Sequence, residues 1–210
     1  PLAGGVSLGI HESQSRTWEN IVGRSKAFWS HFYPALQQKF PSLGNIDLNT
    51  FYRGINKVEP SFIRTEADEA TYNLHIMLRM ELEIALMEGS LEVKDLPAAW
   101  NERFENYLGL TPPNDTLGVL QDIHWSAGLF GYFATYTMGN VIAAQLWQRY
   151  GALQPDRDAA IARGDFSGLL QWLRTTLHHS GRKFTPQELL ERAVGGRLDP
   201  EPYLRYLESK

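Results

Sequence analysis

The stretch SAGLFGYFATYTMGNVIAA, residues 126–144, is the most apolar part of the chain and decides the class of its fold. Tyr, Thr, Gly and Asn interrupt it, and it follows the ionisable residues Asp122 and His124. A membrane-spanning helix needs about 18 or more consecutive apolar residues, and no such run occurs in the sequence. The stretch therefore predicts a buried helix, running from about Leu117 to Tyr150, whose glycines pack close to neighbouring backbone.

Helical spacing of apolar residues recurs on both sides of this stretch. Residues 12–39 predict one long amphipathic helix interrupted near Pro34, and residues 62–87 predict a second. Residues 97–108 predict a shorter helix that Gly109 ends. Short helices are expected in the last third, where start signals stand at Asp165, Thr185-Pro186-Gln187-Glu188 and Asp199-Pro200. Strand-like alternation is almost absent outside residues 51–61, so the sequence predicts an all-α fold with little or no β structure.

Composition excludes several classes of protein. With 210 residues, 43% of them hydrophobic, the chain can bury a substantial core. Its net charge of −4 comes from scattered Lys and Arg offset by 24 acids, which argues against a nucleic-acid partner. The chain has no cysteine, so any metal must be held by His and carboxylates, and a cytoplasmic location is expected. It begins at Pro1 without a basic signal-peptide region, which predicts a fragment or a processed chain.

The stretch GIHESQSRTWEN, residues 9–20, begins like the zinc-protease motif H-E-x-x-H and then departs from it. In that motif two histidines four residues apart hold zinc on one helix face, but here Ser15 stands in the fifth place. Glu12 and Arg16 are also four residues apart, so an exposed helical ion pair is the alternative interpretation.

A second cluster of polar residues lies in and after FIRTEADEATYNLHI, residues 62–76. These residues fall on one face of the predicted helix, opposite its apolar stripe, and the local pattern indicates a solvated charged face. The face consists of Arg64, Asp68, Tyr72, His75 and Arg79.

A third cluster lies in GVLQDIHWSAGLFGYFATYTMGN, residues 118–140. Here polar side chains occur within or beside a strongly apolar segment, where an unpaired buried group costs about 1–3 kcal/mol. They must be either functional or satisfied in a core network, and both possibilities stay open. The residues are Gln121, Asp122, His124, Tyr132 and Tyr136, and the two tyrosines are spaced to point to one place.

Taken together and in this order, the three clusters resemble the carboxypeptidase Taq family of zinc metallocarboxypeptidases. The matching motifs are HESQ at residues 11–14, IRxxAD at 63–68 and GxxQDxHW at 118–125. The similarity runs through all 210 residues, including the closing ELLERAVGG. The fold it implies has long helices that form one wall of a zincin-type peptidase cleft.

The resemblance also implies roles for particular residues. Glu12 would be the third zinc ligand, with other divalent metals left open. Arg64 would grip the free C-terminal carboxylate of a peptide substrate, with Gln121 and Asp122 orienting the groups around it. His124 would line the pocket, and Tyr136, or alternatively Tyr132, would donate a hydrogen bond to the oxyanion.

The chain also departs from the family, because the H-E-x-x-H helix and the other upstream motifs are missing. We therefore expect residues 1–210 to be the C-terminal part of one catalytic domain, inactive alone and without tightly held zinc. The expected partners are peptides with a free C-terminus, the missing N-terminal portion and a second copy in a homodimer, with no membrane. The alternative is a non-catalytic helical binding or structural module derived from such a peptidase.

Overall fold

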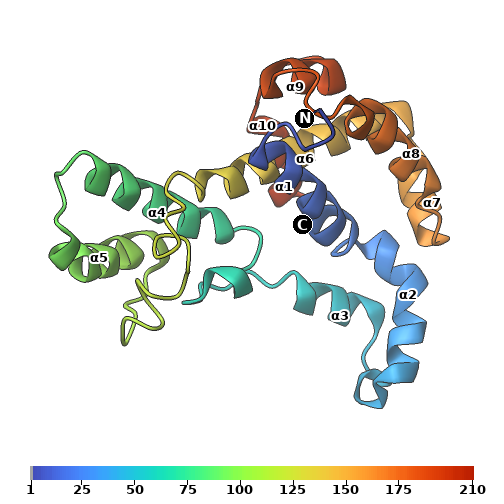
Figure 1. Ribbon diagram of the computed structural model, residues 1–210. Helices are drawn as coiled ribbons and strands as arrows, with labels where there is room; N and C mark the ends of the chain where they lie inside the picture. Colours follow the sequence, from blue (N-terminus) through green and yellow to red (C-terminus); the bar gives the residue numbers. More distant parts are fainter. Residues whose placement is uncertain (1) are drawn as a thin grey trace. The chain divides into compact units, whose positions relative to one another are not determined.

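The computed structural model describes residues 2–210, and within them every regular element is a helix, as the sequence predicted. The contacts divide the chain into two compact units (Figure 1): unit 1 comprises 1–56 and 138–210, and unit 2 comprises 57–137. Among the described residues no helix combines the length and apolar character needed to cross a membrane. Whether 1–210 belong to one catalytic domain stays a prediction.

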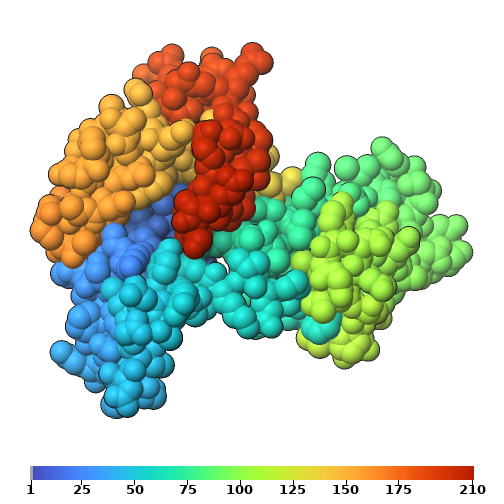
Figure 2. Space-filling view, turned by 180° about the vertical axis from the view of Figure 1, so that it is seen from behind, coloured from blue at the N-terminus to red at the C-terminus, as the bar shows by residue number. Residues whose placement is uncertain are grey.

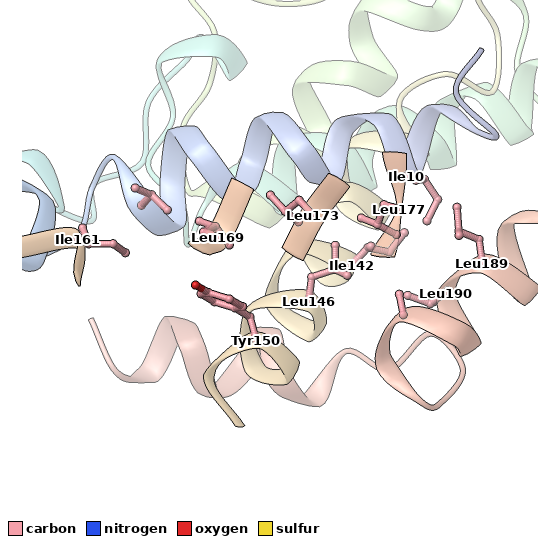
Figure 3. Close-up of a cluster of buried hydrophobic side chains, with 12 residues drawn as sticks. Ile10, Ile142, Leu146, Tyr150, Ile161, Leu169, Leu173, Leu177, Leu189 and Leu190 are labelled. Atoms are coloured by element: carbon pink, nitrogen blue, oxygen red, sulfur yellow. The ribbon is translucent and has the colours of Figure 1, made fainter. Parts of the chain in front are cut away.

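Unit 1 is built around one large apolar cluster. Ile10, Ile142 and Leu146 belong to one cluster with Leu173 and Leu189 (Figure 3), and each is at most 7% exposed. The helix α10 packs separately, through Tyr203 on Val141 and Ala144, and lies on the surface of this unit as the red segment of Figure 2. The elements of unit 1 are α1 (Leu8–Arg16), a π-helical turn (Thr17–Val22), α2 (Lys26–Lys39), α3 (Leu48–Ile55), the main part of α6 (Ala134–Leu153), α7 (Arg157–Ala162), α8 (Ser167–Thr176), α9 (Pro186–Val194) and α10 (Glu201–Glu208), with short 3-10 turns at Pro41–Leu43 and His178–Ser180.

Unit 2 is built on the helix pair α4 (Tyr72–Met87) and α5 (Leu96–Leu108), which pack side by side (Figure 1). Leu78 and Leu82 of α4 meet Trp100 and Phe104 of α5, and all four are at most 1% exposed. Short 3-10 turns precede each helix, at Arg64–Glu66 and Val93–Asp95. A long run of turns over 110–133 then leads into the first turn of α6.

Two features of the first third of the chain differ from the prediction. The first helix breaks at 23–25, where Ser25 accepts a hydrogen bond from the Phe28 amide at 3.1 Å and starts α2, and Pro34 lies inside α2. The segment 51–61 contains no strand, because Asp47 caps α3 by accepting from the amides of Asn49 and Thr50.

Two further predicted helices start later than expected. The helix predicted from 62 begins only at Tyr72, because the Asp68 carboxylate accepts from the Ala70 and Thr71 amides and turns the chain there. The helix predicted from Leu117 begins at Ala134, since Gly128 and Gly131 have φ of 73° and 77°. Such left-handed residues end a right-handed helix. The predicted stop at Gly109 and the capping box at Thr185 are confirmed.

Alanine substitutions at two glycines test the left-handed turn before α6. At both Gly131 and Gly54 an added Cβ would meet no heavy atom within 4 Å, so only backbone conformation distinguishes them. We expect Gly131→Ala to lower the free energy of unfolding by about 1–2 kcal/mol, because it forces an L-residue into left-handed φ. Gly54→Ala, inside α3, should raise it by about 0.5–1 kcal/mol. Urea denaturation measures both changes. An increase in the free energy of unfolding of Gly131→Ala, equal to that of Gly54→Ala, would contradict the left-handed turn at Gly131.

Candidate functional site

The carboxylate of Asp122 is the centre of a buried cluster in unit 2. It follows the turns that begin at residue 115 and receives two arginines from different elements. Arg64 Nη2 donates to Oδ1 at 2.6 Å, and Arg64 Nε lies 3.1 Å and 3.2 Å from Oδ1 and Oδ2. Arg79 donates to Oδ2 from Nε and lies 2.8 Å from it through Nη2 as well. Two positive charges therefore share one negative charge.

Arg64 is held by its backbone as well as by its side chain. Its amide donates to Gln121 Oε1 at 2.9 Å, and Gln121 Nε2 donates in turn to the carbonyl of Phe62 at 3.0 Å. Gln121 thus ties the segment that carries Arg64 to the turns that carry Asp122. The guanidinium also donates to Tyr72 Oη at 2.9 Å and lies 4.9 Å from the ring centre of Tyr136.

Arg79 comes from the middle of α4 and is completely buried. Its Nη1 donates to the carbonyl of His75 one turn earlier at 2.7 Å. The guanidinium lies 4.5 Å from the ring centre of Trp100 and 5.4 Å from that of Phe133, within cation–π range of both. Hydrogen bonds at the edge of the Arg79 guanidinium and aromatic rings against its face therefore fix its position.

His124 adjoins the same carboxylate and contacts both predicted tyrosines. Its Nδ1 is 3.8 Å from Asp122 Oδ1, and its Nε2 is 3.0 Å from Tyr136 Oη. The ring centres of Tyr132 and Tyr136 lie 5.3 Å and 5.9 Å from the imidazole and 5.5 Å from each other. The two tyrosines thus converge on His124, although Tyr132 precedes the first turn of α6, and the hydrogen-bond contact is made by Tyr136.

The charge states in this cluster follow from burial and from the two arginines. Burial opposes ionisation of Asp122, but hydrogen bonds and charges from Arg64 and Arg79 outweigh it and lower its pKa. Burial also lowers the pKa of His124, with the arginine charges adding to the effect and Asp122 opposing it. Burial and the same two arginines lower the pKa of His75 to about 3. Both histidines are neutral near pH 7, so Arg64, Arg79 and Asp122 together carry one net positive charge.

The prediction that α4 presents a solvated charged face is wrong. Arg64, Asp68 and Arg79 are each at most 9% exposed, and Tyr72 and His75 are buried with them. The side of α4 that faces solvent in this structure is apolar instead, with Met77, Met80, Ile84 and Met87 between 44% and 65% exposed. The polar stripe turns inward because Asp122, 43 residues away from Arg79, neutralises part of its charge.

Three participants were missed as parts of a site: Arg79, Tyr72 and His75. Their spacing carries a weak signal, because His75 and Arg79 fall beside the buried Leu78 and Leu82 on one helical stripe. Nothing in the sequence of α4 alone indicates the acidic partner. The burial of this stripe depends on a contact that only the folded chain reveals.

Glu12 lies on α1, in unit 1. Its Oε1 accepts from Arg16 Nε at 2.7 Å and its Oε2 accepts from Ser15 Oγ at 2.8 Å, so the helical ion pair is present. The side chain is partly buried, at 20% exposure. A Cβ on Gly139 would come within 2.5 Å of Glu12 Cγ, so α1 and α6 pack this closely only because residue 139 is glycine.

The described residues do not by themselves fit a metal site. Protein metal sites of the zinc-peptidase type use three side-chain ligands, and no group of three His, Cys, Asp or Glu side chains is arranged to hold a metal within residues 2–210. Glu12 is one possible donor, and its two oxygens already accept hydrogen bonds from Arg16 and Ser15. No chemical step through a metal follows from these residues.

Comparison with solved structures places the fold among carboxypeptidases. The chain superposes with a TM-score of 0.96 and 49% identity on the M32 carboxypeptidase from Deinococcus radiodurans, covering 100% of this chain and 42% of that one. It also matches the carboxypeptidase of Pyrococcus furiosus at a TM-score of 0.97 and 45% identity, over 100% of this chain and 42% of that one. The fold of this chain is therefore the one that these carboxypeptidases have over about two fifths of their length.

The family follows from the sequence comparisons. The model of the carboxypeptidase Taq (M32) metallopeptidase family matches residues 1–210, and the chain belongs to this family. It is 50% identical over 210 residues to thermostable carboxypeptidase 1 of Thermus thermophilus, covering 100% of this chain and 41% of that protein. The chain thus spans about two fifths of the length of such relatives. Membership of a metallopeptidase family implies a divalent metal.

The buried histidine predicts a specific pH dependence of stability. His75 has a folded pKa of about 3 against an ordinary value of 6.5, so below pH 6.5 the unfolded chain binds a proton that the folded chain does not. The free energy of unfolding should therefore decrease as the pH is lowered below 6.5, by up to about 1.4 kcal/mol per pH unit from this group. Urea titrations from pH 7 to 4 should show a steeper fall for the wild type than for His75→Leu. An equal fall in the free energy of unfolding with decreasing pH for the two proteins would contradict the lowered pKa of His75.

Proposed function

We propose that this chain is the C-terminal portion of a zinc-dependent carboxypeptidase that hydrolyses residues from the free C-terminus of peptides. The remaining zinc ligands and the general base would come from the rest of the polypeptide, with Glu12 as the ligand supplied here. Zinc rather than another divalent metal, and assembly as a homodimer, belong to the same proposal and rest on the family resemblance.

The observation that carries the proposal is the pair of buried arginines on the single carboxylate of Asp122. Arg64 has five N–H donors, of which Nε, one on Nη1 and one on Nη2 are used by Asp122 and Tyr72. One donor on each Nη is not used in these contacts, and a guanidinium can bind a carboxylate through two such donors. The side chain is only 7% exposed, so such a contact would form largely out of water, where it is stronger.

His124 and Tyr136 would act on the scissile carbonyl beside this carboxylate site. Because the pKa of His124 is lowered by burial, the ring is neutral at pH 7 and one nitrogen carries the proton. In the Nε2–H tautomer the ring donates to Tyr136 Oη, 3.0 Å away. The phenol is then oriented as the donor toward the oxyanion that forms during hydrolysis. Tyr132, whose ring centre lies 5.3 Å from that of His124, is the alternative donor.

Replacing Glu12 tests the metal ligand in the intact polypeptide. Glu12→Gln keeps the shape and removes the charge, so bound zinc and peptidase activity should both be lost. The loss of activity should exceed the roughly 10–100-fold that a change outside the ligand shell costs. Zinc content by mass spectrometry of the purified protein and kcat/KM on a free-acid peptide measure the two effects.

Glu19→Gln is the matched control, because Glu19 is exposed and also pairs with Arg16, at 3.4 Å. It should keep zinc and activity. Retained zinc in Glu12→Gln would contradict the ligand role, and an intact wild type without zinc or activity would favour the non-catalytic helical module.

Replacing Arg64 tests carboxylate recognition. Arg64→Ala should lower kcat/KM on a peptide with a free C-terminal carboxylate by about 100-fold or more, as expected when one partner of a buried charge pair is removed. The same substitution should have a much smaller effect on the C-terminally amidated peptide, which never uses the clamp. Equal losses on the two peptides would make Arg64 a structural residue.

A further inference from the structure

Arg79 is the most deeply buried charged side chain of unit 2, at 0% exposure. The proposed function does not assign a role to this residue. Taking a guanidinium out of water costs several kcal/mol unless its contacts compensate. Asp122 already has a partner in Arg64, so neutralising Asp122 does not by itself require a second arginine. The contacts that the two arginines make with the oxygens of Asp122 indicate the role of Arg79.

Each arginine makes its shortest contact to a different oxygen of Asp122, although Arg64 Nε also lies 3.2 Å from Oδ2. The shortest contact of Arg64 is to Oδ1, from Nη2 at 2.6 Å, whereas Arg79 approaches Oδ2, from both Nε and Nη2 at 2.8 Å. Without Arg79, Oδ2 would keep only the longest Arg64 contact, from Nε at 3.2 Å, and the carboxylate would be less restrained about its bond to Cβ. Held at both oxygens, its plane is fixed, and so is the direction of the edge it offers to Arg64.

Arg79 is itself anchored by groups that do not contact Arg64 through a hydrogen bond. The carbonyl of His75 accepts from Nη1 at 2.7 Å, and Trp100, from α5, lies under the guanidinium at 4.5 Å. The position of Arg79 is therefore set by the packing of α4 on α5. Through Asp122 this packing is transmitted to Arg64, which lies on a short 3-10 turn outside the helix pair.

We propose that Arg79 is a positioning residue: by holding Oδ2 of Asp122 it fixes the carboxylate that orients Arg64 toward the C-terminal carboxylate of a peptide. The inference rests on the proposed function, because it assigns Arg79 to the same recognition site. Arg79 acts through Asp122 and Arg64 and does not touch the substrate. Its positive charge adds to the field of the site, so the test must separate position from charge.

The experiment compares two inhibitors of the intact carboxypeptidase that differ only in the recognised group, N-acetylphenylalanine and its amide. Their inhibition constants are measured against hydrolysis of a free-acid peptide for the wild type, Arg79→Lys and Arg79→Gln. Lysine keeps the charge but cannot hold Oδ2 and the His75 carbonyl together. We expect Arg79→Lys to reduce the preference for the acid over the amide by about tenfold, raising KM while kcat changes by less than about twofold.

A double-mutant cycle shows whether Arg79 acts through Arg64. In an Arg64→Lys background, adding Arg79→Lys should cause no further loss of preference, because the group it positions is already gone. Additive losses would overturn the proposal. Arg103→Lys is the matched control, since Arg103 on α5 pairs with Glu81 at 3.4 Å on the surface of the same unit, and it should leave the preference unchanged.

The remaining outcomes distinguish failure of the proposed function from failure of the positioning role. If the wild type does not prefer the acid, carboxylate recognition fails and the proposed function fails with it. If the wild type prefers the acid and the folded Arg79 variants keep that preference, only the positioning role is overturned. If neither Arg79 variant folds, as judged by circular dichroism, Arg79 is a residue that the fold requires and the positioning role is overturned as well.

Discussion

The carboxylate that Asp122 shares between two arginines is the constraint on which unit 2 depends. Each buried guanidinium needs that carboxylate, because an unpaired charge in the interior costs several kcal/mol. The 3-10 turn that carries Arg64, the helix that carries Arg79 and the turns that carry Asp122 must therefore meet at one point. Gln121 then sets the register of the first segment through the Arg64 amide, and Trp100 sets the position of Arg79. His124 lies next to Asp122 as a consequence.

The left-handed glycines before α6 are part of the same arrangement. His124 and Tyr136 are 12 residues apart in the sequence, and their side chains approach to 3.0 Å. In one continuous helix the same two residues would be separated by about 18 Å along the axis. The turns at Gly128 and Gly131 bring the chain back. The segment predicted as a helix from Leu117 therefore could not have been helical if His124 and Tyr136 were to meet.

The sequence predicts much of the fold because most of its signals are local. The stop at Gly109 and the capping box at Thr185 depend on a few neighbouring residues, and both are confirmed. The motif residues Arg64, Asp122 and Tyr136 do meet within one unit, although their roles stay predictions. The burial of the polar stripe on α4 could not be predicted from such local signals. Periodicity indicates which residues share a face but not which face is buried, and here the acid that permits burial is distant in sequence.

Recognition and metal binding make different physical demands, and this chain meets them to different degrees. The cluster around Arg64 has its net charge, its neutral histidines and its aromatic faces set by residues of unit 2 alone. The contacts within this cluster therefore do not involve Glu12, the proposed metal ligand. Glu12, in unit 1, has a carboxylate oriented by Arg16 and Ser15 and room made by Gly139, yet one donor cannot hold a metal. If the proposed function is right, carboxylate binding and metal binding are separable properties of this polypeptide, and loss of the metal should abolish hydrolysis while leaving the recognition cluster formed.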